Sequence, residues 1–337
     1  MSLKTLTAAA LSTTMIVGLA LPATADVSTR TIRVSNGIAA EHPVGNGVDA
    51  MRACFDERTG GAWTLNAFWS SALGDDLQAT QMLRSGTLEM VITSTSPLVG
   101  ITPALGVFDL PFLFANAEEA DAILDGEFGD YVSDMLPDYN LVNLAYWENG
   151  FRDLTNSLRP VESLADFSGM RVRVMQNDIF LDTFQTLGTN ALPMAFGEVF
   201  TALETGTIDA QENPYVTIDT SHFYEVQKYL SNTHHAYTPF MVLFSKPIFD
   251  TYSEEEQQIL VDCAVIGRDV QRAASRALSE ESLARIEAAG LAVNDISDEN
   301  MAEIRDAVQG VYERHADAIG AETVERMRAA LADLRGE

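Results

Sequence analysis

Segments typical of strands and of helices alternate along this chain from about residue 31 onward. The short runs 31–35, 63–67 and 89–93 have the composition and spacing of strands. Between them, apolar side chains recur at helical spacing over 44–60 and 75–85, and each of these segments ends at glycine. This β-α-β-α-β order predicts an α/β fold with a mostly parallel, doubly wound sheet.

The same pattern begins again in the second half of the chain. Residues 171–175 predict a strand, and helices are expected over 180–187 and 197–205. Gly86 and Gly206 stand at corresponding points, each between the end of a helix and the start of a strand. The chain that follows the N-terminal leader, described below, has just over 300 residues. This is more than one compact core usually carries, so two similar lobes are expected.

The C-terminal part of the sequence is helical. Ser253 and Glu256 form a capping box, and an apolar pattern then continues towards Gly290, which predicts a helix of roughly 50 Å that crosses both lobes as a spine. A short strand near 291–293 and two amphipathic helices should follow. Because no flexible linker separates the halves, strands must join them as a hinge. The lobes are expected to comprise 26–150 with about 238–277, and 151–237 with about 278–337.

The first 25 residues have the pattern of a secretory leader. Lys4 precedes an apolar run over 8–21, and small residues stand at Ala23 and Ala25, as before a cleavage site. We therefore expect export to the periplasm and a mature chain that starts at Asp26. There is no cysteine beside this site to carry a lipid anchor, and no later run of 18 apolar residues.

The composition is strongly acidic. The chain has 21 Lys and Arg against 49 Asp and Glu, which gives a formal net charge of −28 at pH 7. This charge excludes nucleic acid as a partner, because phosphate binding requires a basic surface. It suits a solvated surface in a salty medium. If the ligand is an anion, a few basic residues must hold it inside a cleft.

Cysteine and histidine give no sign of a metal site, a cofactor or an enzyme. Cys54 and Cys263 either form a disulfide, if the helices that carry them pack together, or remain two buried thiols. The motifs of zinc proteases, serine hydrolases, nucleotide-binding loops and dinucleotide-binding folds are missing from the sequence. The five histidines lack ligand spacing with acidic residues; they are His42, His222, His234, His235 and His315.

Basic and amide side chains at strand ends are the candidates for function. Asn149 and Gly150 interrupt a strand just before Arg152, where one lobe should lead to the other. Arg171 and Arg173 share one face of a strand, and a guanidinium matches the two oxygens of a carboxylate. The alternative is that each arginine pairs with one of the many acids of this chain. Residues 211–214, which include Asn213, end another strand and form either part of a binding site or a polar turn.

Together these segments resemble the solute-binding proteins of tripartite ATP-independent periplasmic (TRAP) transporters, over nearly the whole mature chain. The matching segments are 57–61, 73–74, 83–90, 108–114, 150–152, 169–173, 196–199, 205–209, 211–214 and 223–226. The resemblance implies a two-lobed periplasmic-binding-protein fold of type II-like architecture with a long spine helix. It also implies that Arg173 binds the carboxylate of the ligand, that Asn213 hydrogen-bonds the same group and that Arg152 assists in binding it. Met170 and Ala210 depart from residues common in the family, without removing a ligand group.

The rest of the cleft should set selectivity. The expected wall positions are Glu41, His42, 93–96 with Ser94, Asn149, Gln176, Asn177, Phe196, His235 and Tyr237. Many hydroxyl and amide groups around an arginine suit a hydroxylated acid such as a uronate or aldonate. A C4-dicarboxylate is the alternative ligand, with Arg152 or His235 on its second carboxylate.

The expected function is to bind a small organic acid anion as a monomer and deliver it to the membrane permease of the transporter. Two other functions stay open at this point. A secreted lyase or isomerase acting on such acids would need a base near the cleft. A receptor role, presenting the ligand to a chemoreceptor, is compatible with transport.

Overall fold

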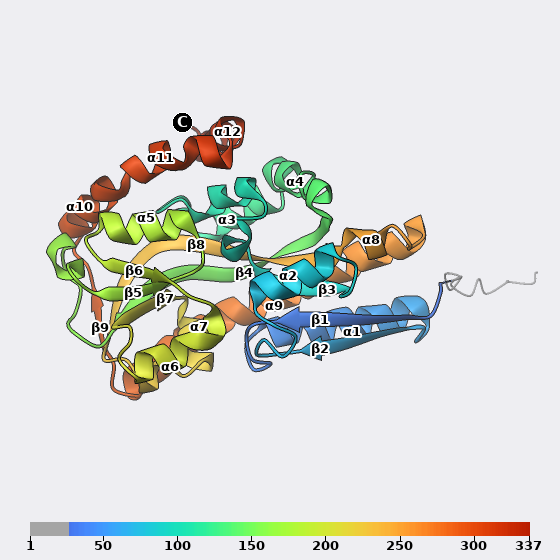
Figure 1. Ribbon diagram of the computed structural model, residues 1–337, viewed down its shortest axis with the longest axis horizontal. Helices are drawn as coiled ribbons and strands as arrows, with labels where there is room; N and C mark the ends of the chain where they lie inside the picture. The colour runs from blue at the N-terminus through green and yellow to red at the C-terminus, as the bar shows by residue number, and fades with distance from the viewer. Residues whose placement is uncertain (1–26) are drawn as a thin grey trace, which may run out of the picture.

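The computed structural model describes residues 27–337, in which two lobes are joined by long shared elements (Figure 1). The expected leader, residues 1–25, lies outside the described residues. Lobe I contains the first three strands, and lobe II contains the strands β5, β6 and β7. The two-lobed α/β fold with a long C-terminal helix is thus confirmed.

One sheet of nine strands runs through both lobes, in the order β2-β1-β3-β8-β4-β7-β5-β6, with β9 beside β8. Pairing is parallel inside each lobe, as the alternating pattern predicted. The strand β4 pairs with β8 in antiparallel orientation, and β8 with β3 and β4 with β7 do so as well. The two long strands β4 and β8 cross from one lobe to the other in opposite directions. The strands are β1 (Arg30–Asn36), β2 (Trp63–Phe68), β3 (Met90–Ser94), β4 (Leu141–Asn156), β5 (Arg171–Val174), β6 (Asn190–Pro193), β7 (Ala210–Asn213), β8 (Tyr229–Ser245) and β9 (Ala292–Asp295).

Helices cover the faces of the sheet and both ends of the molecule (Figure 1). Lobe I carries α1 and α2, lobe II carries α5, α6 and α7, and α9 runs beneath both. The α-helices are α1 (Val44–Thr59), α2 (Asp76–Arg84), α3 (Ala117–Leu124), α4 (Glu127–Ser133), α5 (Asp178–Thr186), α6 (Val199–Glu204), α7 (Tyr215–Thr220), α8 (Lys246–Phe249), α9 (Glu254–Ala288), α10 (Asp298–Val308), α11 (Gly310–Ile319) and α12 (Ala321–Arg335).

The helix ends follow local sequence signals. Gly60 ends α1 in the left-handed conformation, and Gly86 and Gly206 both have positive φ where α2 and α6 lead to β3 and β7. Ser253 and Glu256 cap α9 as expected. The C-terminal region differs from the two helices that we predicted. It has three, because Gly320, with φ of 106°, separates α11 from α12.

The crossing strands β4 and β8 join the two lobes, and we call them the hinge. Their register shifts between Glu148 and Gly150 and again between Arg152 and Leu154. We expected Asn149 and Gly150 to interrupt the strand. Instead β4 continues through them, because Gly150 adopts a φ of 116° that only glycine tolerates well and so accommodates a bulge.

The spine helix α9 is fastened mainly to lobe I and the hinge. Cys54 of α1 and Cys263 of α9 form a disulfide, with their Cα atoms 5.5 Å apart, so the choice left open by the sequence is decided. Further along α9, Arg272 and Arg276 pair with Asp121 of α3. The division of the chain into lobes at particular residues stays a prediction, since the largest apolar cluster includes side chains from both.

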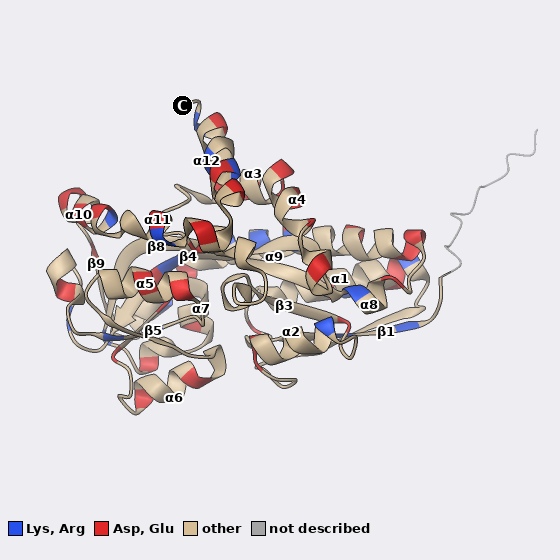
Figure 2. Ribbon diagram, turned by 45° about the horizontal axis from the view of Figure 1, so that its top comes forward, with Lys and Arg blue, Asp and Glu red and all other residues tan. Residues whose placement is uncertain are grey.

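The surface of the described chain is acidic, as the composition requires. Positions occupied by Asp and Glu, red on the ribbon of Figure 2, occur on most of the helices, whereas the blue positions of Lys and Arg are fewer. Within residues 27–337, no helix combines the length and the apolar character needed to cross a bilayer.

Candidate functional site

A cavity lies between the lobes, at the carboxyl ends of the strands of both. This is where open α/β sheets bind their ligands, because the loops after the strands diverge there. Lobe I contributes the residues after β1, the end of β3 and the start of α2, and lobe II contributes the ends of β5 and β7. The lining residues are Asn36, Gly37, Ile38, Asp76, Ile92, Thr93, Ser94, Pro97, Asn149, Arg152, Arg173, Met175, Gln176, Met194, Ala195, Phe196, Asn213 and Phe240.

Arg173 brings a buried positive charge to this cavity. The residue is only 3% exposed, and its Nε and Nη2 atoms donate to the carbonyl oxygen of Met194 at 3.0 and 2.8 Å. No Asp or Glu in residues 27–337 forms an ion pair with it, and its Nη1 donates to none of their oxygens. Burial lowers the pKa of Arg173 to about 10, although the charge of Glu212 acts in the other direction. The group is therefore cationic at neutral pH, and it has no directly paired acid within the described chain.

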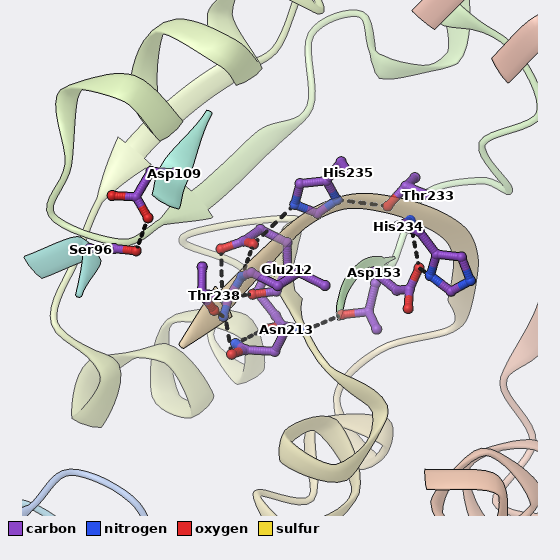
Figure 3. Close-up of polar contacts among 12 residues, drawn as sticks. Ser96, Asp109, Asp153, Glu212, Asn213, Thr233, His234, His235 and Thr238 are labelled. Atoms are coloured by element: carbon purple, nitrogen blue, oxygen red, sulfur yellow. Dashed lines mark hydrogen bonds and ion pairs between the residues drawn. The ribbon is translucent and has the colours of Figure 1, made fainter. Parts of the chain in front are cut away.

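Arg152, by contrast, is neutralised within the protein. Its Nη2 donates to Glu212 Oε1 at 2.9 Å, its Nε donates to Glu212 Oε2, and both residues are fully buried. His235 bonds the same carboxylate through Nε2 at 3.1 Å (Figure 3). Thr238 accepts a hydrogen bond from Arg152. Burial alone would raise the pKa of Glu212, but Arg152 and His235 lower it to about 2. We call Arg152, Glu212 and His235 the hinge network.

Amide and hydroxyl groups complete the polar part of the cavity. Asn213 Oδ1 accepts from Arg152 at 3.1 Å and its Nδ2 donates to Gln211 at 2.6 Å, which leaves one amide hydrogen to donate. Within residues 27–337, Ser94 Oγ and Asn149 Oδ1 are buried and lack any hydrogen-bond partner. Buried polar atoms are normally bonded, so unpartnered ones at a cavity indicate groups that a ligand satisfies.

One acidic residue of the cavity was missed by sequence reasoning. Asp76 follows Asp75, which caps α2 with a capping box, so the pair resembles an ordinary acidic helix start. The structure turns the second of these carboxylates toward the cavity, where it lines the lobe I side. Burial raises the pKa of Asp76, and this shift is partly offset by a bond from Thr93 and by the charge of Arg173.

The structure brings most, but not all, of the expected site residues to this cavity. Arg173, Arg152, Asn213, Asn149, Ser94 and Phe196 line it, as do Thr93 and Gln176. Glu41 does not, because it is exposed at the surface. His42 is buried elsewhere against Thr217, where burial lowers its pKa to about 3.

The other expected wall residues lie behind the cavity. His235 belongs to the hinge network, between the rings of Phe180 and Phe184. Asn177 caps α5 and donates to Asp109 at 2.6 Å. Tyr237 is buried on the opposite side of the hinge. These contacts depend on strand pairing between distant segments, which the sequence alone did not reveal.

The geometry of two lobes around such a cavity agrees with a match to a known family. Residues 34–318 match the family described as bacterial extracellular solute-binding protein, family 7. The chain belongs to this family. Its members include the TRAP solute-binding proteins, so the resemblance drawn from the sequence motifs is confirmed. The family is periplasmic and supplies the solute-binding subunits of transporters.

Relatives of this family 7 protein bind acids derived from sugars. The 2,3-diketo-L-gulonate-binding periplasmic protein YiaO of Escherichia coli is 42% identical over 64% of this chain and 66% of its own length. The sugar acid binding protein of Advenella mimigardefordensis, solved with galactonate, has a TM-score of 0.89 and 42% identity, covering 91% of this chain and 99% of that one. A Polaromonas protein bound to D-erythronate has a TM-score of 0.85 and 33% identity, covering 89% and 98%.

A larger hollow of about 820 Å³ lies on the other side of the hinge in this family 7 protein. It is bounded by α9, the C-terminal helices and the hinge strands. Its arginines already have partners: Arg276 pairs with Glu148, Arg335 pairs with Glu119, and Arg305 stacks on Phe112. Arg305 is exposed to solvent, whereas Arg173 of the interlobe cavity is buried and forms no ion pair with the described acids, so the interlobe cavity is the better candidate for an anion site. Within the described chain, no group of three His, Cys, Asp or Glu is arranged to hold a metal ion.

Proposed function

We propose that this protein binds a hydroxylated monocarboxylic acid, an aldonate or a uronate, in the interlobe cavity and delivers it to the membrane permease of a TRAP transporter. The carboxylate of the ligand lies on Arg173. The hydroxyl groups of the ligand bond the polar side chains that lobe I and the hinge contribute.

The observation that carries this proposal is the buried, unpaired guanidinium of Arg173. Burying a charge without a counter-ion is costly, and proteins normally avoid it by pairing the group. Among residues 27–337, the guanidinium of Arg173 donates only to the carbonyl of Met194. A ligand carboxylate supplies the missing negative charge and accepts the strong, charge-assisted bonds that a guanidinium donates.

Ligand binding and lobe closure are coupled in this arrangement. Arg173 and Asn213 belong to lobe II, whereas Ser94 and Asp76 belong to lobe I, so one ligand can bond both lobes only when they are close together. The bulged strands β4 and β8 give the hinge on which the lobes move. The ligand then shifts the balance toward the closed form through contacts made only there. The closed form is the one that we expect the permease to recognise.

The polar groups of the cavity favour a ligand that carries hydroxyls. Ser94 Oγ and Asn149 Oδ1 have no protein partner in the described chain. A hydroxyl can donate to one and accept from another, whereas an apolar ligand leaves both atoms unpaired at a cost of about 1–3 kcal/mol each. The relatives solved with galactonate and D-erythronate carry ligands of this kind.

The cavity is less well suited to a C4-dicarboxylate, the alternative ligand. Such a ligand would need Arg152 or His235 for its second carboxylate. Both groups already bond Glu212, and His235 lies behind the cavity lining. A lyase or isomerase would need a base free to take a proton from the substrate, and the hinge network does not provide one. Glu212 is held by Arg152 instead.

Binding measurements on the mature chain test this proposal. We expect galactonate, erythronate and galacturonate to raise the melting temperature in a thermal-shift screen, since a tight ligand stabilises the folded state. In calorimetry, Arg173→Ala should weaken the best ligand by roughly 100-fold or more, since truncating one partner of a buried charge pair costs about 2–5 kcal/mol.

Arg171→Ala is the matched control, two residues along the same strand. Arg171 pairs with Asp209 at the surface and does not line the cavity, so this variant should bind as the wild type does. Unchanged affinity in a correctly folded Arg173→Ala protein would refute the assignment. Catalytic turnover of any of these acids would refute the binding-only function.

A further inference from the structure

Asp76 brings a carboxyl group to the cavity from lobe I, whereas Arg173 lines it from lobe II. It lies in the first turn of α2, after Asp75 has used its own side chain to cap the helix through Gln78. A Cβ atom added to Gly37, at the end of β1, would lie 3.2 Å from Asp76 Oδ1, so this carboxylate reaches the strand end where the cavity begins.

Asp76 has few protein partners for an acid that lines an internal cavity. Within residues 27–337 it forms no ion pair with Lys, Arg or His. Arg173 acts on it only at longer range, and the neighbouring hydroxyl of Thr93 also lowers its pKa. Its burial is therefore not offset by a direct counter-ion. The residue is not a structural partner of Arg173, because the two side chains do not meet.

A ligand that fits between these two charges must have unlike ends. One end needs a carboxylate for Arg173, and the other needs hydrogen-bond donors for Asp76, since an ionised carboxylate only accepts. We propose that Asp76 is the specificity-determining residue that selects acids with one carboxylate and a hydroxylated far end, and that rejects the corresponding dicarboxylates. This inference rests on the proposed function, because it assumes that the ligand carboxylate lies on Arg173.

The discrimination has a simple electrostatic origin. Galactonate and galactarate differ only at carbon 6, which carries a hydroxyl in the first acid and a carboxylate in the second. The hydroxyl donates to Asp76, whereas the carboxylate adds a like charge beside it and brings no donor. Specificity of this kind, built on an unfavourable contact with the wrong ligand, is a common design in binding sites.

The test compares two matched ligand pairs on the mature protein. Galactonate with galactarate, and erythronate with meso-tartrate, differ within each pair only by the oxidation of one terminal CH₂OH. Calorimetry on the wild type should show the monocarboxylate bound roughly 100-fold more tightly in at least one pair, given the strength of like-charge repulsion at a partly buried site. Asp76→Asn keeps the size of the side chain but removes its charge. It should reduce that preference about tenfold or more, mainly by strengthening the dicarboxylate.

Asp75→Asn is the control, one residue earlier on the same helix. Asparagine caps helices as well as aspartate does, so this variant removes the same charge while α2 keeps its cap. Asp75 does not line the cavity, and the preference should stay as in the wild type.

The outcomes separate this inference from the proposed function. If Asp76→Asn binds both acids with the wild-type ratio, or if the wild type prefers the dicarboxylates while Arg173→Ala loses them, the role of Asp76 is wrong and the carboxylate site stands. If affinity does not depend on Arg173 at all, both proposals fall together.

Discussion

The hinge network and the interlobe cavity each contain a buried arginine, yet the two arginines differ in what holds them. Arg152 has two bonds to the carboxylate of Glu212, which His235 also bonds. Arg173 has the carbonyl of Met194 and no acid of the described chain. In such an acidic protein, a buried cation without an internal acid is exceptional. We therefore propose that the first arginine stabilises the fold and that the second binds the ligand.

The largest effect on stability should come from breaking the hinge network. Arg152→Ala leaves the carboxylate of Glu212 buried without its cation, and breaking a buried pair in this way typically costs about 3–5 kcal/mol. We expect a loss of this size in the free energy of unfolding, measured by urea denaturation. Replacing Arg152 and Glu212 together by Met and Leu should restore much of it. A change below about 1 kcal/mol in the single variant would contradict a structural role for Arg152.

The second prediction concerns acid pH and the same network. The folded pKa of Glu212, about 2, lies below its ordinary value of 4.5, so the contribution to stability is complete above pH 4.5 and is lost as the pH falls toward 2. The full shift corresponds to about 3 kcal/mol. The stability difference between wild type and Glu212→Gln, measured by urea unfolding in steps from pH 6 to pH 3, should therefore shrink below pH 4.5. A constant difference would show that Glu212 is not held ionised by Arg152.

Another buried acid near the cavity provides an internal contrast for this experiment. Burial raises the pKa of Asp109 to about 7, despite its bonds from Ser96 and Asn177. Between about pH 4 and 7, Asp109 therefore keeps its proton in the folded protein but has lost it in the unfolded chain. The contribution of Asp109 to stability falls as the pH rises through this range. The two acids act in opposite directions and in separate pH windows.

The sequence was most informative where local signals decide the structure. The capping box at Ser253 defined the start of α9, and the alternation in 171–175 placed Arg173 on a strand. The fold class followed from the order of such elements. Residues 96–139 carry weaker periodicity, and their helices α3 and α4 were not anticipated.

The hydrogen-bond and ion-pair partners of the arginines could not be predicted from such local sequence signals. The antiparallel register of β4 with β7 puts Leu154 opposite Glu212, which brings Arg152 to that acid from 60 residues away. The sequence left both pairing and binding open for each arginine. Asp76 was missed for a related reason: an acid in the first turn of a helix is commonplace, and only the tertiary structure places its carboxylate near Gly37 and in the cavity lining.

The smallest effect on stability is expected at Arg173, the residue that we propose to bind the ligand carboxylate. Arg173→Ala removes a buried cation that the described chain does not neutralise, so the lost bonds to Met194 are offset by relief of the desolvation cost. We expect the free energy of unfolding without ligand to change by less than about 1 kcal/mol, or to rise. Urea unfolding in ligand-free buffer measures it, with Arg152→Ala as the contrasting variant. A loss as large as that of Arg152→Ala would mean that both arginines hold the fold together, and the distinction between hinge network and cavity would fail.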